Sequence, residues 1–386
     1  MLSKTSELAA SEAALQPASE VGVRARAAPR VHALDGLRAL AASLVMFHHF
    51  GANTVGKRLM EKGHQTLGYL LSTVGASGVE LFFVLSGVVL VRQYVRSGRQ
   101  LELGLYARRR FERIYPPYVV AWLAAGLAIA VISHAPTWWS ATAALPTFQF
   151  SPWLQQLPII YSGAHYNFPC WSLGVEVLFY FFVPLLVPLV ARLPDKQVTA
   201  LVVTSLAAIL SFGIERARPA FLPLPLTDLL RHSVCFASGL VLARLDLQRT
   251  TALAFGAVGV IVLLLAARVD AHLVHVGYCA LYVGLVARAL DAESRISRQL
   301  GRWHFVWMGE RSYSLFLIHG PVILLVYWAS SRLFSGPNAA FLLVSRLTAF
   351  VLSWLSALLI FGLVERRYAR GLVTGNQLLP IEPPSA

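Results

Sequence analysis

The feature that most constrains this chain is a series of long apolar runs that recur along almost its whole length. The hydrocarbon core of a bilayer is about 30 Å thick, so a helix that crosses it needs about 20 mostly apolar residues. Windows of this length predict about ten spans, at residues 33–52, 77–95, 115–133, 169–191, 197–214, 228–245, 250–267, 271–290, 305–330 and 340–363. Because lipid cannot satisfy exposed backbone groups, each span is expected to be a helix. The expected fold is an all-α polytopic membrane protein with its helices in one bundle.

Composition agrees with this fold class. Only 13% of the 386 residues are charged and 56% are hydrophobic, whereas soluble domains carry about 25% charged residues. The net charge of +14 could suit a nucleic-acid partner. However, the basic residues lie mostly in short loops between apolar runs, as they do in the cytoplasmic loops of membrane proteins. We therefore expect the lipid bilayer, and no nucleic acid, as a partner.

The distribution of Lys and Arg also predicts the orientation. With the N-terminus inside, the inner loops are rich in arginine and the outer loops are poor in it, so both termini are expected in the cytoplasm. Residues 1–30 contain no apolar core and no cleavage site, so we expect a disordered cytoplasmic tail and no signal peptide. Residues 31–370 form the expected membrane domain, and residues 371–386 a second cytoplasmic tail.

The first expected span carries four ionisable residues, which are costly in a membrane helix and by default mark a functional site. At 100° per residue, Arg38 and His49 share nearly one face, Asp35 lies within about 40° of it, and His48 points about 80° away. The stripe from Arg38 to His49 is about 16 Å long. A lone histidine is more often a packing residue, but the aligned groups favour function. Helix phase favours His49 over His48, and a kink at residues 41–43 would change that phase.

Other spans add ionisable groups. Glu176 is expected about 9–10 Å below the outer end of its helix, at the depth of His49, so the two could form a base and its orienting carboxylate. His319 could line the same cavity or be a satisfied packing residue. Glu365 lies at the inner face, where it could pair with arginines.

The second expected span begins with small residues around a carboxylate. Gly78, Ser86 and Gly87 are expected to allow close helix contact. Glu80 lies near the outer end of the span and could either line the cavity or sit at headgroup level. Both readings of Glu80 stay open.

A basic segment precedes the third expected span. Arg110 and Arg113 are i, i+3 neighbours, which share a face on a helix. Two guanidinium groups on one face suit phosphate oxygens, because the planar fork binds them bidentately. A plain positive charge cluster that stops translocation is the alternative, but the position directly before Pro116 and Pro117 favours phosphate binding.

The sequence offers no sign of a metal site or a permanently bound cofactor. Cys170, Cys235 and Cys279 lie in or beside apolar runs and show neither metal-ligand spacing nor a disulfide pattern. The outer loop 134–168 has no Asp, Glu, Lys or Arg but many aromatic residues. It could present an aromatic surface to a sugar or lipid-linked acceptor, or form an interfacial aromatic belt.

Six short motifs occur in one order along the chain, at residues 34–49, 78–87, 110–116, 171–180, 312–319 and 365–366. Each is weak alone, but together they are specific. With them the chain resembles the acyltransferase-three family of membrane acyltransferases, which includes bacterial O-antigen and exopolysaccharide O-acetylases, over roughly residues 33–370. Phe316 replaces a more usual Tyr, and Arg367 stands where Pro is commoner; neither position touches the expected chemistry.

The resemblance implies a ten-helix domain in the bacterial inner (plasma) membrane. It implies transfer of an acyl group, which we expect to be acetyl, from cytoplasmic acetyl-CoA to a hydroxyl of a glycan or lipid-linked glycan on the outer side. Arg110 and Arg113 would hold the phosphates of this co-substrate, and Arg38 would line the inner mouth. His49 would act as general base or carry the acyl group, and Glu176 would orient it.

Two other classes of protein remain. A proton-coupled secondary transporter would also have about ten spans with buried His, Glu and Arg, but the chain shows no repeated halves and no paired broken helices. A non-catalytic scaffold or sensor on the same fold would not need His49 or the arginine pair, and both are present.

Overall fold

The computed structural model describes residues 31–96, 100–133, 165–194, 197–217, 224–333 and 339–368. Both expected tails, and the expected aromatic loop up to residue 164, lie outside these residues. Within them every regular element is helical and there is no strand, which confirms the all-α class. The family resemblance and the apolar helices agree on a membrane protein.

The helices follow one another with short connections. In chain order they are α2 (His32–Phe47), η1 (His48–Ala52), α3 (Asn53–Glu61), α4 (Gln65–Val74), α5 (Gly78–Val95), α6 (Leu103–Ser133), η3 (His165–Cys170), α10 (Trp171–Ala191), α11 (Gln197–Ala217), α12 (Leu224–Arg231), α13 (Ser233–Arg244), α14 (Arg249–Arg268), η4 (Ala271–Leu273), α15 (Val274–Leu290), α16 (Arg295–Leu300), α17 (Trp303–Glu310), α18 (Ser312–Leu333), α19 (Ala339–Ile360) and η5 (Phe361–Glu365).

Seven helical segments of the described chain are long and apolar enough to cross a membrane, so the expected number of about ten spans is not confirmed. They are Gly78–Val95, Trp171–Ala191, Gln197–Ala217, Arg249–Arg268, Ala271–Leu290, Ser312–Leu333 and Phe341–Tyr368. Two of the remaining expected spans are broken. The first ends as an α-helix at Phe47 and continues as a π-helical turn. The one at 228–245 breaks at His232, which leaves α13 with 12 residues.

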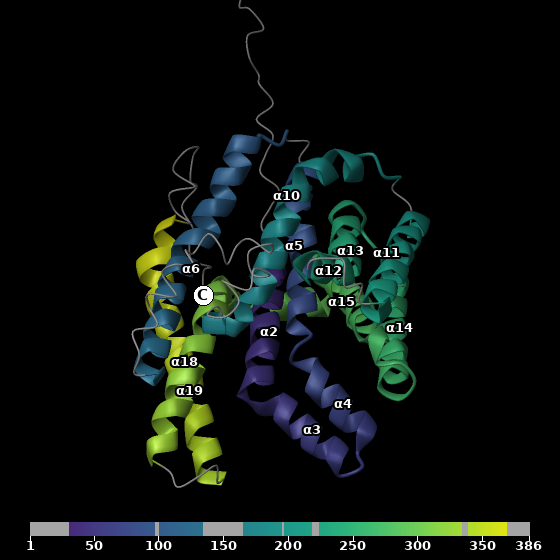
Figure 1. The fold of residues 1–386 in the computed structure, drawn as a ribbon. Helices are drawn as coiled ribbons and strands as arrows, with labels where there is room; N and C mark the ends of the chain where they lie inside the picture. Colours follow the sequence, from purple (N-terminus) through teal and green to yellow (C-terminus); the bar gives the residue numbers. More distant parts are fainter. Residues whose placement is uncertain are drawn as a thin grey trace, which may run out of the picture.

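Helices α2 and α5 occupy the middle of the bundle (Figure 1). Helix α2 packs on α5, α17 and α18, and α5 packs on α10, α13 and α15. In Figure 1 α6, α18 and α19 lie to one side of this pair, and α11, α14 and α15 lie to the other. The short helices α3 and α4 pack on each other at one end of the bundle. Residues of α2 and α5 can therefore contact the helices on either side of them.

Small residues let α5 approach its neighbours closely, as the sequence predicts. A Cβ at Gly78 would collide with the carbonyl oxygen of Ala41 on α2. A Cβ at Gly87 would lie 2.7 Å from the carbonyl oxygen of Phe236 on α13. These two contacts bring the backbones of three helices together, which is how small residues act in membrane bundles. Ser86 has a different role, described below.

Candidate active site

A cavity in the middle of the bundle joins side chains from five helices, α2, α5, α6, α10 and α18. It is narrow, with a volume of about 70 Å³. The polar side chains that line it are Arg38, Ser86, Arg110, Arg113, Ser172, Glu176, Tyr180, Ser312 and Tyr313. We call this space the arginine cavity. Four residues that the sequence analysis singled out, namely the three arginines and Glu176, thus meet at one place, although they come from three separate motifs.

The arginines are held by neighbours that leave their charge facing the cavity. Arg38 Nη1 lies 3.1 Å from Oδ1 of Asp35, one helical turn earlier, and Asp35 is only 5% exposed. The guanidinium of Arg110 lies 5.7 Å from the ring centre of Tyr106 and 5.8 Å from that of Tyr180, within the range of cation–π attraction. Asp35 does not line the cavity itself but holds the side chain of Arg38, which does.

A third arginine of the basic segment provides a contrast. Arg108 points away from the cavity, with its side chain 72% exposed, and pairs with Glu112 at 2.7 Å. Its neighbours Arg110 and Arg113 line the cavity together, as the i, i+3 spacing predicts. Of these three arginines, one therefore faces the solvent and two face the cavity.

Glu176 is fixed by two hydroxyl donors. Its Oε1 accepts a hydrogen bond of 2.8 Å from Ser86 Oγ and one of 2.5 Å from the hydroxyl of Tyr180. Tyr106 in turn donates to the carbonyl oxygen of Tyr180 at 3.1 Å. These bonds tie Glu176 to α5 and to its own helix, and its expected pairing with His49 stays a prediction.

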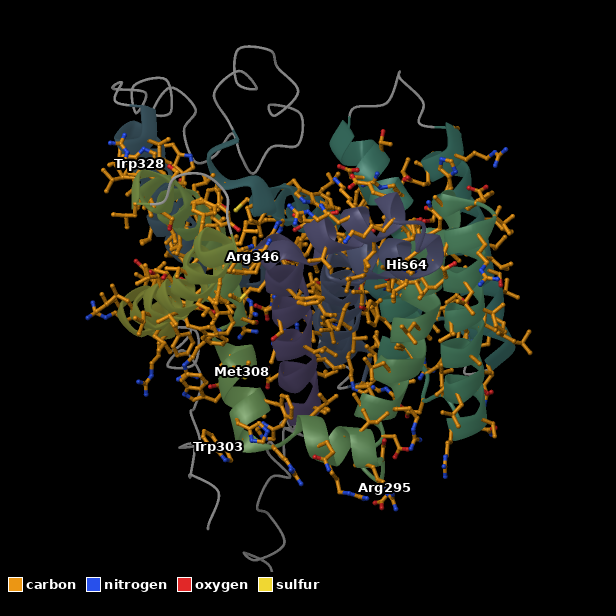
Figure 2. All side chains as sticks on the ribbon, turned by 90° about the horizontal axis from the view of Figure 1, so that it is seen from below. His64, Arg295, Trp303, Met308, Trp328 and Arg346 are labelled. Atoms are coloured by element: carbon orange, nitrogen blue, oxygen red, sulfur yellow. The ribbon has the colours of Figure 1, made fainter. Side chains whose placement is uncertain are left out.

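His49 lies in the π-helical turn η1, which follows α2. Helix α2 is continuous through residues 41–43, so the irregularity lies beyond them, and Gly51 adopts a φ of 128°, a left-handed conformation that favours glycine. Single π-helical turns inside helices often occur at functional sites. Arg346 of α19, labelled in Figure 2, packs against this turn, since a Cβ at Gly51 would lie 2.5 Å from its guanidinium carbon. Sequence analysis did not single out Arg346.

The two candidate histidines of this turn have different surroundings. The ring of His49 lies 5.3 Å from that of His319 on α18. His48 packs against the backbone beyond α4, because a Cβ at Gly75 would lie 2.6 Å from its Cβ. His319 is fully buried, and its Nδ1 lies 3.2 Å from the carbonyl oxygen of Leu315. His49 and His319 therefore form a pair, here called the histidine pair.

One aromatic side chain stands between the histidine pair and the arginine cavity. The ring of Phe316 lies 5.9 Å from His319 and 6.0 Å from the ring of Phe82. Both phenylalanines line the cavity. Phe316 therefore contacts both the histidine pair and the arginine cavity.

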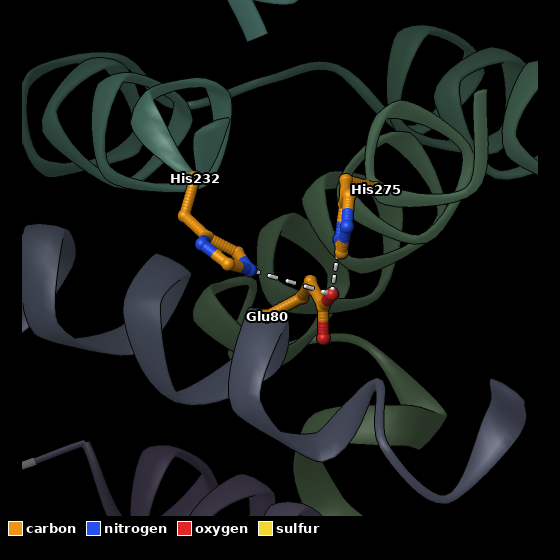
Figure 3. Close-up of side chains that lie close together, drawn as sticks. All are labelled: Glu80, His232 and His275. Atoms are coloured by element: carbon orange, nitrogen blue, oxygen red, sulfur yellow. Dashed lines mark hydrogen bonds and ion pairs between the residues drawn. The ribbon is translucent and has the colours of Figure 1, made fainter. Parts of the chain in front are cut away.

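The remaining cavity candidates lie behind the lining residues or elsewhere. Glu365 accepts a hydrogen bond of 2.5 Å from Ser314, and the charges of Arg113 and Arg38 act on it. Glu80 belongs to a separate buried cluster, in which its Oε1 lies 2.7 Å from Nδ1 of His275 and 3.8 Å from Nε2 of His232 (Figure 3). The sequence alone does not single out these two histidines, because they come from elements far apart in the chain. Their one signal is that each is an ionisable residue at the end of an apolar run.

Comparison with known proteins shows the family of the chain. The family model Acyl_transf_3, described as an acyltransferase domain, matches residues 31–364. The chain is 33% identical over 181 residues to "Acyltransferase MdmB" of Streptomyces mycarofaciens, an alignment that covers 44% of this chain and 42% of that protein. No solved structure matches the chain significantly. The chain belongs to the acyltransferase-three family of membrane acyltransferases.

Proposed function

We propose that the protein is a membrane O-acyltransferase of the inner membrane. It moves an acetyl group from cytoplasmic acetyl-CoA to a hydroxyl of a glycan or lipid-linked glycan on the outer side. The observation that carries the proposal is the convergence of Arg38, Arg110 and Arg113 on one cavity, one aromatic side chain away from the histidine pair. An anion site and a base are then separated by one aromatic side chain within one bundle.

The proposed binding of acetyl-CoA rests on the positive charge of the three arginines. Coenzyme A carries several phosphate groups, and guanidinium groups bind phosphate through paired, charge-assisted hydrogen bonds. The inward side chains Arg110 and Arg113 come from one turn of α6, and Arg38 reaches the same cavity from α2. Asp35 holds Arg38 in place before the donor arrives.

The transfer step needs a base near the thioester. His49 removes the proton of the acceptor hydroxyl, whose oxygen attacks the thioester carbonyl. The bond from carbon to sulfur breaks, a bond from carbon to oxygen forms, and the thiolate of CoA takes up the proton. The products are an ester and free CoA, so atoms and charge balance without another reactant. The Nδ1 of His319 donates to the carbonyl of Leu315, because a carbonyl only accepts, and this fixes the ring beside His49.

The narrow cavity sets a condition on donor binding. A volume of about 70 Å³ cannot hold a pantetheine arm, since small-molecule pockets commonly measure about 300–1,000 Å³. Phe316 lines the cavity and lies 5.9 Å from His319, and the ring of Phe82 packs against it. A pantetheine arm that displaces the Phe316 ring would bring the thioester beside the histidine pair.

Equilibrium binding measurements test whether the arginines bind acetyl-CoA. The purified chain in nanodiscs is titrated with acetyl-CoA and with S-acetyl-pantetheine, which lacks the phosphates. Arg113→Ala should weaken acetyl-CoA binding roughly tenfold or more, because a hydrogen bond to a charged group contributes about 1.5–3 kcal/mol, and should leave S-acetyl-pantetheine binding unchanged. Arg108→Ala is the matched control, since Arg108 faces away from the cavity. Equal losses in both variants would contradict the assignment.

Mass spectrometry tests whether the protein acetylates a glycan or glycolipid. Glycans and glycolipids from cells that express the wild-type chain are compared with those from cells that express His49→Ala at equal membrane levels. The proposal expects acetyl esters that depend on His49. Acetylation that is the same in both would overturn the role of His49.

A further inference from the structure

A buried cluster of ionisable groups lies outside the arginine cavity, where α5, α11, α15 and the junction of α12 and α13 meet. One ligand atom from each of Glu80, His232 and His275 lies within 4.8 Å of the others. Figure 3 shows both imidazole rings directed at the Glu80 carboxylate. We propose that these three side chains bind a divalent transition-metal ion, with Zn²⁺ the ion that suits them best.

The distances are close to those that a zinc ion needs. Nitrogen and oxygen ligands about 2.0–2.2 Å from a tetrahedral zinc ion lie roughly 3.3 Å from one another. Glu80 Oε1 lies 2.7 Å from His275 Nδ1 and 3.8 Å from His232 Nε2, so the two observed separations bracket that value. The third separation, between the two histidine nitrogens, is at most 4.8 Å, so the rings would have to approach each other by up to about 1.5 Å to reach the coordination geometry.

The tautomer of His232 gives an independent reason. Its Nδ1 lies 2.8 Å from the carbonyl oxygen of Asp228, and a carbonyl only accepts, so Nδ1 carries the hydrogen. In the neutral ring Nε2 then presents a lone pair toward the Glu80 carboxylate. Two acceptors that face each other need a cation between them. A histidine whose other nitrogen donates to a backbone carbonyl is the usual arrangement of a metal ligand.

His275 has a carboxylate near its far side. Its Nε2 lies 3.9 Å from Oε2 of Glu215, which is longer than a hydrogen bond, and Glu215 is itself held by Arg231 at 3.2 Å. A carboxylate behind a metal-bound histidine orients the ring and raises its basicity as a ligand. His232 therefore has a second partner of the kind that metal sites use, and Glu215 would become one for His275 if the two side chains approached by about 1 Å.

The charge of Glu80 also favours a cation at this place. Glu80 is only 5% exposed and lies among apolar helices, where a buried carboxylate is costly. With His232 and His275 neutral, neither histidine offsets this charge. Within the described part of the chain, Oε2 of Glu80 has no hydrogen-bond partner. A divalent ion would offset the charge of Glu80 and give this oxygen a partner.

A metal ion at this site would hold α5 in place, and α5 lines the arginine cavity. His232 packs against the rings of Phe83 at 5.1 Å and Trp171 at 5.9 Å, and Phe83 also lines the cavity. Glu80 lies on α5, which further along carries Ser86, the donor to Glu176. Two imidazoles and one carboxylate form a ligand set that zinc commonly takes, with a fourth position left for water.

Elemental analysis of the purified full chain tests the proposal without any activity assay. Protein purified without chelators should carry about one zinc ion per chain, and its melting temperature should fall after chelation and recover when Zn²⁺ is added. Glu80→Gln keeps the shape of the side chain but removes its charge, and should weaken zinc binding at least roughly tenfold. His275→Ala should do the same. His272→Ala is the matched control, because His272 is more exposed, lies three residues away and pairs with Asp270.

Three results would overturn the proposal. One is wild-type protein that neither retains zinc nor changes its melting temperature when Zn²⁺ is added, which would show that protonated histidines balance the carboxylates. The second is zinc that Glu80→Gln and His275→Ala retain with wild-type affinity. The third is zinc that His272→Ala loses to the same degree as these two variants. Glu80→Gln decides the matter if a histidine variant does not fold.

Discussion

The hydrogen bond from Ser86 to Glu176 offers the sharpest test of the site's architecture. Ser86→Ala removes the 2.8 Å donor to Oε1 of Glu176 and leaves the close packing of α5 intact, because alanine is smaller than serine. A hydrogen bond to a charged group contributes about 1.5–3 kcal/mol. If Glu176 must be fixed for transfer to occur, this energy corresponds to a loss of roughly ten- to a hundredfold in rate.

The assay for Ser86→Ala is release of CoA from acetyl-CoA by the chain in nanodiscs, read with a thiol reagent. We expect kcat to fall while KM for acetyl-CoA changes little, since the arginines are untouched. Tyr180→Phe removes the second donor, at 2.5 Å, and the double variant should lose less than the product of the two single losses. Ser331→Ala is the control, because Ser331 is exposed and its hydroxyl donates to the carbonyl oxygen of Trp328 in the same helix. A kcat within twofold of wild type for Ser86→Ala would refute the reasoning.

Three further predictions concern the histidine pair, the wall of the cavity and the packing of α5. His49→Ala should lower turnover by about 10²–10⁴-fold, whereas His48→Ala should keep most of it; the reverse order in the CoA-release assay would exchange their roles. Phe316→Trp should narrow the passage, so transfer should fall while acetyl-CoA binding stays at the wild-type level; a parallel loss of binding would show that the ring contacts the head of the donor instead. Gly87→Ala should lower the stability by about 1–3 kcal/mol, because its Cβ would meet the backbone of α13. At Gly126 a Cβ meets open space, so Gly126→Ala should be neutral or slightly stabilising. Melting temperatures in detergent compare the two, and an equal effect of both would argue against the close helix contact.

Short-range patterns predicted much of this site. The i, i+3 spacing of Arg110 and Arg113 fixes their common face whatever the rest of the fold does, so their joint position in the cavity follows from helix geometry. The position of Arg38 and Glu176 in the cavity follows from the cost of placing an ionisable group against lipid. Helix class follows from the same physics, because lipid leaves a spanning backbone few alternatives.

The features that the sequence did not predict depend on contacts between distant segments. The π-helical turn at His48–Ala52 packs against Arg346 and the segment after α4, and no local pattern specifies it. The break at His232 accompanies the bond from its ring to the carbonyl of Asp228. Ser86 was expected only to pack, but its hydroxyl has a partner on α10. The number of spans stays open for a similar reason, since broken helices do not match a window of fixed length.

The central claim is that acetyl-CoA bound by the arginines reacts beside His49. The most direct measurement follows CoA release and acetyl transfer by the purified chain in nanodiscs with radiolabelled acetyl-CoA and extracted glycolipid. The wild-type chain is compared with Arg113→Ala, His49→Ala and the control Arg108→Ala, all at matched melting temperature. The account predicts turnover that is lost in Arg113→Ala through weaker donor binding, lost in His49→Ala with donor binding intact, and kept in Arg108→Ala. Full turnover in His49→Ala, or no acetyl-CoA binding by the folded wild-type chain, would contradict it.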